Sequence, residues 1–174
     1  MQAVETWDTI RARRNVRAYE DRPIPPEHLD RILEAARRSP SSTNQQAWDF
    51  VVVTERERLR DLAKVWNWAA HVGTSAATVA LVMPASDDPE DRETYQYDLG
   101  QATISIMLAS ADLGIGSCHA SVGDQALARD LLGLPEDREC PLLLSLGYPA
   151  DRPLAPIARR RRRPFDDVIH RERW

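Results

Sequence analysis

The sequence predicts an α+β layered domain. Three apolar runs have the length of buried strands, and the stretches between them carry apolar residues at helical spacing. The strands and helices alternate without a run of regular βαβ units, which fits this class. A chain of 174 residues suits one domain with a proper core. We therefore expect a single domain over 1–174, with about 150–174 as an extended C-terminal arm.

The first part of the chain is expected to form two helices and a strand. Thr6 or Asp8 can cap a first helix that ends near Arg14. Prolines followed by Glu27 mark the entry to a second helix, over about 27–38. Its buried face is Leu29, Ile32, Leu33 and Ala36. The short polar residues of 39–44 stop this helix, and the apolar run that follows predicts a strand over about 48–54.

The remainder alternates in the same way. We expect strands over about 77–83 and 140–147, a short strand or loop over 117–122, and helices over about 55–68, 92–113 and 124–132. Asp124 caps the last helix and Gly133 stops it. The long helix is apolar nearly all round, which indicates a central helix or one at a subunit interface.

Composition restricts the partners. The net charge of −4 and the pI near 5.6 weigh against a general nucleic-acid binder. The sequence begins without a signal-type apolar stretch and its apolar runs are too short to span a bilayer, so we expect a cytoplasmic protein with no membrane partner. Neither the two cysteines (Cys118, Cys140) nor the four histidines (His28, His71, His119, His170) have ligand spacing, and no metal is expected.

Arginine clusters are the main functional signal. Four arginines fall within 11–17 and five within 159–163. Lys64 is the only lysine, so arginine is the usual basic residue throughout this chain. The clustering of the arginines therefore indicates a site, whereas the choice of arginine over lysine does not. A cluster of like charges favours a bound anion, and guanidinium groups bind phosphate or carboxylate in a bidentate manner. Two plainer interpretations stay open: a solvated helix end for the first cluster, and a tail that contacts nucleic acid for the second.

Four stretches, taken together, resemble the flavin-dependent nitroreductase family. They are Arg13-Arg14-Asn15-Val16-Arg17-Ala18-Tyr19, Ser39-Pro40-Ser41-Ser42-Thr43-Asn44-Gln45-Gln46-Ala47-Trp48-Asp49-Phe50, Leu113-Gly114-Ile115-Gly116-Ser117-Cys118, and Arg162-Arg163-Pro164-Phe165-Asp166-Asp167-Val168-Ile169-His170 leading to Trp174. They span nearly the whole chain in the family's order. The resemblance implies a nitroreductase-like fold with a central mixed or antiparallel sheet, and a homodimer that exchanges its C-terminal arms.

The same resemblance implies that FMN binds at the dimer interface. The residues it assigns to the phosphate are Arg13, Arg14, Asn15, Arg17, Arg160 and Arg162. Those it places beside the flavin ring are Pro40, Ser41, Ser42 and Asn44, usually from the other subunit, together with Asn67, His119, Ala120 and Ser121. No catalytic side chain is implied, because N5 of the flavin carries the chemistry.

The implied activity is reduction of nitroaromatics, quinones or a similar small electron acceptor by NADH or NADPH, in a ping-pong cycle. Asn15 stands where the family usually has Ser, and Ala47 where it has Pro. The region after Trp66 is short, so the acceptor does not follow from the resemblance. Two alternatives remain: a relative with flavin-consuming or reductive dehalogenating chemistry, and a non-catalytic flavin-binding module.

Overall fold

The computed structural model describes residues 5–157 and 162–174. Its helices are α1 (Thr6–Ala12), α2 (Pro26–Arg37), α3 (Arg56–Leu62), α4 (Pro89–Asp112) and α5 (Gln125–Leu132). Its strands are β1 (Asp49–Val53), β2 (Ala77–Pro84), β3 (Gly116–Ser121) and β4 (Arg138–Gly147). Four short 3-10 turns are η1 (Ser42–Asn44), η2 (Ala63–Val65), η3 (Ala70–Thr74) and η4 (Phe165–Asp167).

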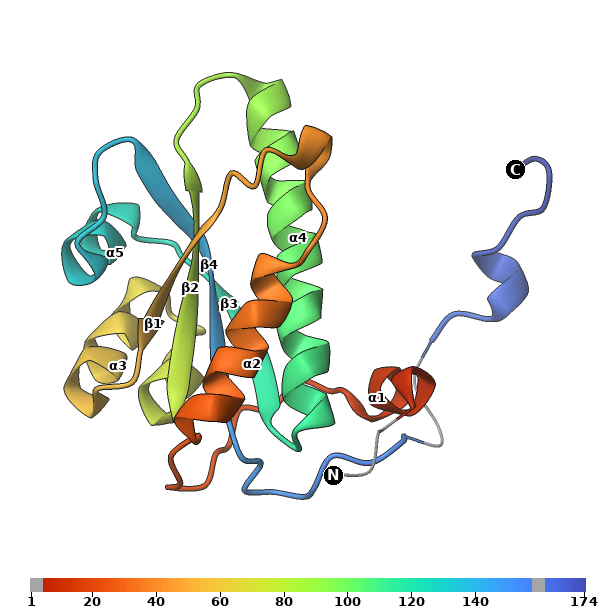
Figure 1. Ribbon diagram of the computed structural model, residues 1–174, viewed down its shortest axis with the longest axis horizontal. Coiled ribbons are helices and arrows are strands. Elements are labelled where there is room, and N and C mark those ends of the chain that lie inside the picture. The colour runs from red at the N-terminus through yellow and green to blue at the C-terminus, as the bar shows by residue number, and fades with distance from the viewer. Residues whose placement is uncertain (1–4, 158–161) are drawn as a thin grey trace.

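The four strands form one antiparallel sheet in the order β1-β2-β4-β3 (Figure 1). In β2, Val79 and Leu81 belong to the core on one face, and Ala80 and Val82 to the core on the other. Since successive side chains of a strand point to opposite faces, both faces of β2 are buried. That is why its sequence is a continuous apolar run.

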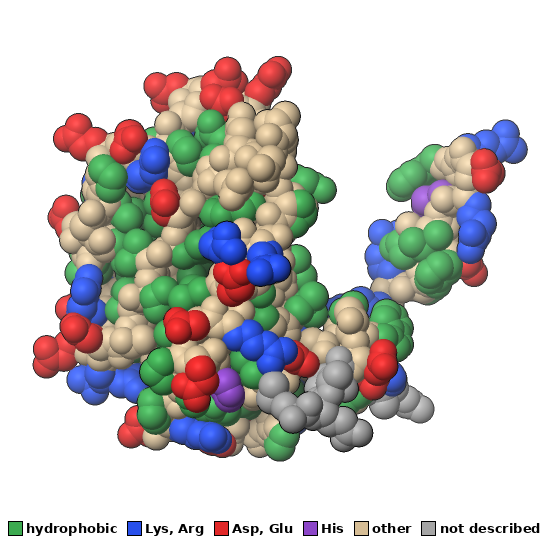
Figure 2. Space-filling model, in the orientation of Figure 1, with side chains coloured by type: hydrophobic (Ala, Val, Ile, Leu, Met, Phe, Trp, Pro, Cys, Tyr) green, Lys and Arg blue, Asp and Glu red, His purple; other side chains and the backbone are tan. Residues whose placement is uncertain are grey.

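Helices cover both faces of the sheet. The core on one face joins the sheet to α2 and α4, and the core on the other joins it to α3 and α5 (Figure 1). The predicted α+β fold with a helix-flanked antiparallel sheet is therefore confirmed. One face of α4 remains open, where Tyr97 is 72% exposed and Ile104 is 42% exposed. Figure 2 shows hydrophobic side chains along this open side.

Three predictions about helix ends are wrong. Neither Thr6 nor Asp8 caps the first helix, because Thr6 is already its first residue and Glu5 is the N-cap. The helix expected over about 55–68 ends at Leu62, because the chain tightens into η2 and Trp66 is then extended (φ −160°). The long helix begins at Pro89, three residues before its predicted start. Proline suits the first helical position, and the side chain of Asp88 accepts a hydrogen bond from the backbone N–H of Glu90.

The chain after β4 turns back along the N-terminal segment. Residues 148–157 run beside 11–20: Glu20 N donates to Tyr148 O, Ala150 N to Ala18 O, and Ile157 N to Arg11 O. The segment 162–174 then projects away from the sheet (Figure 1), and its Trp174 is 99% exposed. Arm exchange between subunits stays a prediction. In the described part of the chain, no helix has the length and apolar character needed to cross a membrane.

Candidate functional site

Three residues of the first arginine cluster, Arg13, Arg14 and Arg17, lie in an extended segment on the edge of β3, which we call the arginine segment; Arg11 lies in α1. Asn15 forms a parallel bridge with Ser117, and Val16 N donates to Ser117 O at 3.0 Å. Val16 is buried, whereas Asn15 and Arg17 are exposed. Because side chains alternate along an extended backbone, Arg13, Asn15 and Arg17 share one face, which we call the arginine face.

Two glycines allow this segment to lie close to the sheet. A Cβ added to Gly116 would come within 2.6 Å of the Val16 side chain, and one added to Gly147 within 2.7 Å of the Tyr19 ring. Neither approach is possible for a larger residue without displacement of the segment. The backbone that carries Arg17 is therefore fixed by packing on β3 and β4.

Arg14 points the other way and is engaged within the chain. Its Nη2 lies 2.7 Å from Oδ1 of Asp151 and 2.7 Å from the carbonyl O of Arg152. This ion pair lowers the pKa of the Asp151 carboxyl below its ordinary value, first through the hydrogen bond from Arg14. Arg14 thus ties the chain after β4 to the arginine segment. By contrast, the side chains of Asn15 and Arg17 make no hydrogen bond or ion pair with any described residue.

The predicted ring-facing residues alternate along β3. His119 and Ser121 are exposed, while Cys118 and Ala120 are buried. Burial raises the pKa of the Cys118 thiol, with Arg17 opposing that shift. A buried thiol with a raised pKa is a structural residue and a poor nucleophile. The edge of β3 therefore presents His119, Ser121 and its backbone next to the arginine face.

Asn67 lies in an exposed turn that contacts the loop after β3. The carbonyl O of Val65 accepts hydrogen bonds from Gly123 N at 3.0 Å and Asp124 N at 2.9 Å. The Trp66 ring packs on Gly123, where an added Cβ would come within 2.9 Å. These contacts bring Asn67 to the end of β3 at which Ser121 lies.

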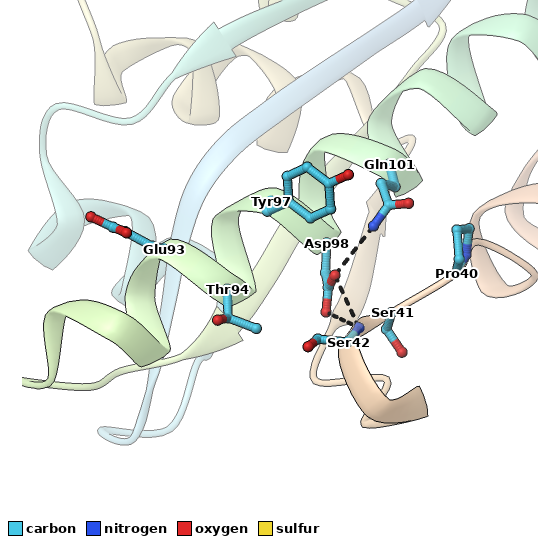
Figure 3. A pocket seen from close by; sticks show the side chains of 8 residues that line it. All are labelled: Pro40, Ser41, Ser42, Glu93, Thr94, Tyr97, Asp98 and Gln101. Carbon is cyan, nitrogen blue, oxygen red and sulfur yellow. Dashed lines mark hydrogen bonds between the residues drawn. The ribbon is translucent and has the colours of Figure 1, made fainter. Parts of the chain in front are cut away.

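The polar loop after α2 lies elsewhere, against α4. Ser42 N lies 3.2 and 3.0 Å from the two carboxylate oxygens of Asp98, and Gln101 Nε2 lies 3.2 Å from Asp98 Oδ1 (Figure 3). Asp98 is only 2% exposed. A cavity of about 460 Å³ opens between this loop and α4. Its lining is Pro40, Ser41, Ser42, Glu93, Thr94, Tyr97, Asp98 and Gln101.

Three residues of this loop have positive φ without being glycine. They are Thr43 (φ 48°), Asn44 (φ 58°) and Gln46 (φ 53°). Such backbone is costly for a β-branched residue such as Thr43 and persists only where the surroundings impose it. The hydrogen bonds from Ser42 N to Asp98, and from Gln46 N to Ser41 Oγ, hold the loop in this form.

A sequence model of the nitroreductase family matches residues 10–104 and, overlapping with these, 65–148. The chain belongs to the nitroreductase family. Archaeoglobus fulgidus has a relative that is 34% identical over 98% of this chain and 99% of its own length, named "Putative NADH dehydrogenase/NAD(P)H nitroreductase". The "FMN reductase [NAD(P)H]" of Bacillus subtilis is 27% identical over 98% of this chain and 74% of its own.

The chain is also similar to a deiodinase and to a solved nitroreductase structure. The iodotyrosine deiodinase of Thermotoga neapolitana is 24% identical over 83% of this chain and 89% of its own. The structure of an FMN-dependent nitroreductase from Clostridium difficile has a TM-score of 0.84, with 23% identity over 97% of this chain and 99% of that one. The likeness to that structure shows the nitroreductase fold.

Within one nitroreductase chain, the predicted site residues fall into two groups. Arg13, Arg14, Asn15, Arg17, Asn67, His119, Ala120 and Ser121 lie along β3, whereas Pro40, Ser41, Ser42 and Asn44 lie against the first half of α4. Arg162 is exposed in the projecting segment, and Arg160 lies outside the described residues.

Sequence reasoning missed the α4 side of the cavity. Asp98, Tyr97 and Gln101 line it, yet in the sequence they are ordinary positions of a long helix. One signal was available: an acidic residue inside an otherwise apolar stretch needs a donor when the helix is buried. As for metals, the described residues hold no group of three or more His, Cys, Asp or Glu side chains that could bind one.

Proposed function

We propose that this nitroreductase uses NADH or NADPH to reduce nitroaromatics, quinones or a similar small electron acceptor, with FMN bound between two copies of the chain. The chain is an FMN-dependent NAD(P)H oxidoreductase by family and by its relatives. The observation that carries the proposed site is the bridge between Asn15 and Ser117, because it sets the arginine face beside the exposed edge of β3.

The residues present fit the phosphate of FMN. Arg17 is an exposed cation without an ion-pair partner among the described residues, and Asn15 beside it offers an amide N–H. An unpaired cation next to a hydrogen-bond donor suits a dianionic phosphate. Arg14 is paired with Asp151. We propose that it holds the segment in place and adds positive charge from the side opposite the arginine face.

The second arginine cluster follows soon after a point where the chain is fixed beside the first. Ile157 N donates to Arg11 O at 3.3 Å, which fixes the chain beside the first cluster. Arg162 follows five residues later, and five residues span at most about 18 Å. We propose that Arg160 and Arg162 close on the phosphate from this side.

The separation of the two groups along α4 supports a dimer. The polar loop is bound at Asp98, whereas α1 contacts α4 near Ala109, eleven residues further on. Eleven helical residues rise about 16 Å, so Ser42 lies far along α4 from the arginine face of its own chain. A second copy, whose Ser41–Asn44 loop reaches the first copy's β3, would complete the site.

The chain's own residues have a modest chemical task. Bound FMN supplies the hydride acceptor and the electron donor of the reaction. The arginine face would hold the phosphate, and backbone N–H groups of the β3 edge would serve as donors to the ring. We propose that reductant and acceptor use one site beside the ring in turn, which gives ping-pong kinetics; the cavity beside Tyr97 is the candidate for that site.

Replacement of Arg13 and Arg17 by Ala tests the site. We expect flavin content and NAD(P)H oxidation to fall together, by about 100-fold in FMN affinity for two charge-assisted contacts. The matched control is Arg58→Ala with Arg60→Ala, which removes two exposed arginines from α3. Retention of full flavin content by the Arg13/Arg17 variant would contradict the assignment.

A second candidate rests on the deiodinase relative, which makes reductive dehalogenation the alternative chemistry for the same site. The two are separated by substrate: release of iodide from iodotyrosine by the reduced enzyme, without turnover of nitroaromatics or quinones, favours dehalogenation. A non-catalytic flavin-binding module would keep FMN and show no NAD(P)H oxidation at all.

A further inference from the structure

A buried network of hydrogen bonds joins the arginine segment to the middle of the sheet. Tyr19 Oη lies 2.6 Å from the carbonyl O of Val16 and 2.7 Å from Oγ of Ser145, on β4. The same Ser145 Oγ lies 2.8 Å from Nδ1 of His71, in η3, and 3.0 Å from the carbonyl O of Cys118, on β3. Ser145 is fully buried and His71 is 6% exposed.

The direction of each hydrogen bond follows from counting the hydrogens. Tyr19 has one hydroxyl hydrogen, and we assign it to Val16 O, which at 2.6 Å is nearer than the other carbonyl it faces, Ser145 O at 3.3 Å. The hydroxyl hydrogen of Ser145 is used toward Tyr19 Oη or Cys118 O. When the Ser145 hydrogen is used in this way, Ser145 Oγ accepts a hydrogen bond from His71 Nδ1. Burial, with Arg17 and His119 nearby, lowers the pKa of His71, which favours the neutral ring.

Val16 is held at three points. Its N–H donates to Ser117 O, its C=O accepts from Tyr19 Oη, and its side chain packs on Gly116. Asn15 and Arg17 flank Val16 directly, so their directions depend on it.

We infer that Tyr19, Ser145 and His71 are positioning residues for the phosphate site, because their network fixes Val16 and thereby directs Asn15 and Arg17 outward. This inference rests on the proposed FMN site. None of the three side chains is itself placed on the arginine face, so each acts through the backbone of Val16. Their contribution is therefore specific to the phosphate half of the cofactor.

Comparison of FMN with riboflavin, which lacks the phosphate, isolates that contribution. Tyr19→Phe removes the hydroxyl that bonds Val16 O and Ser145 Oγ but keeps the ring that packs on Gly147. Flavin-free full-length protein is titrated with each flavin by fluorescence quenching. We expect FMN affinity to fall about tenfold, as for one lost buried hydrogen bond, and riboflavin affinity to change less than about twofold.

Tyr148→Phe is the matched control. Tyr148 is also buried (8% exposed), and its ring stacks under the guanidinium of Arg22 at 3.8 Å. Its hydroxyl makes no hydrogen bond with any described residue. We expect Tyr148→Phe to bind both flavins as the wild type does.

Ser145→Ala provides a second route to the same test if Tyr19→Phe does not fold. It removes the hydroxyl that joins Tyr19 to His71, and a loss confined to FMN is expected again. Equal losses for FMN and riboflavin would show a merely structural role and overturn the inference, as would unchanged FMN affinity in a folded variant. A wild type that does not prefer FMN to riboflavin contradicts the proposed phosphate site itself, before any variant is compared.

Discussion

Both carboxylate oxygens of Asp98 face the backbone N–H of Ser42, at 3.2 and 3.0 Å. This contact joins a buried position of α4 to the loop that is proposed to meet the flavin of the partner subunit. It also explains how a loop with three non-glycine residues at positive φ keeps one conformation. The geometry of that loop is therefore set from α4.

Asp98→Ala is expected to release the loop. The substitution leaves the Ser42 N–H without its acceptor, which costs about 1–3 kcal/mol of folding free energy. Asp98→Asn keeps one acceptor oxygen and should therefore lose less folding free energy than Asp98→Ala. Urea unfolding gives the stability, and FMN titration the effect on the site. Asp91→Asn, an exposed acid on the same helix, is the control, and equal losses in the Asp91 and Asp98 variants would contradict this role.

Gly116→Ala is expected to displace the arginine segment. The new Cβ would lie within 2.6 Å of Val16, and such overpacking costs about 1–3 kcal/mol. Gly100→Ala is the matched control, since an added Cβ there meets nothing within 4 Å. Gly100 lies inside α4, so that change should add about 0.5–1 kcal/mol of stability. The two free energies of unfolding should thus change in opposite directions.

Thr43→Asn is expected to stabilise the protein. Thr43 is β-branched at φ 48°, a region that Asn tolerates better, and the relief amounts to about 1 kcal/mol. Thr54→Asn, at an exposed position with ordinary φ, should not stabilise. Thermal unfolding of both variants checks this, and a lower melting temperature for Thr43→Asn would show that the threonine makes an unrecognised contact.

The ion pair between Arg14 and Asp151 gives a pH dependence. The pKa of Asp151 is lowered in the folded protein, so the pair stabilises at pH values above the carboxyl's ordinary pKa of 3.8 and loses this effect as pH falls through the lowered value. Urea unfolding of wild type and Asp151→Asn should differ at pH 7 and converge in acid. A difference that persists unchanged below pH 3 would exclude this carboxylate as the source.

Ile104→Glu tests the proposed dimer. A charge on the open face of α4 should shift the chain toward monomer in sedimentation experiments and remove flavin at the same time, because one copy holds only half the site. Ala126→Glu, on exposed α5 across the sheet, is the control. A monomeric Ile104→Glu variant that keeps its flavin would contradict a site shared between subunits.

The sequence was informative wherever local chemistry decides the structure. The continuous apolar run of β2 and the cap and stop of α5, Asp124 and Gly133, were predicted from residue type alone and are confirmed. The early end of α3 was not predicted, because it depends on Val65 O accepting a hydrogen bond from Gly123 N, in the loop after β3. That contact joins residues 58 positions apart, and no local pattern encodes it.

The same limit applies to the site. The arginine cluster was visible as a cluster, but the pairing of Arg14 with Asp151, which separates it from Arg13 and Arg17, depends on where the chain after β4 lies. Tyr19 and Ser145 are 126 residues apart, and Ser42 and Asp98 are 56 apart. The two residues of each pair come into contact only when the fold brings their elements together. The residues that support the site are therefore harder to predict from sequence than those that line it.

The most direct test of the central claim is the visible absorption spectrum of the purified protein, followed by anaerobic addition of NADH or NADPH. The account predicts flavin bands, retained through gel filtration, that bleach when the nicotinamide is added. A colourless protein that does not take up added FMN would contradict the anion site on the arginine face and, with it, the proposed function.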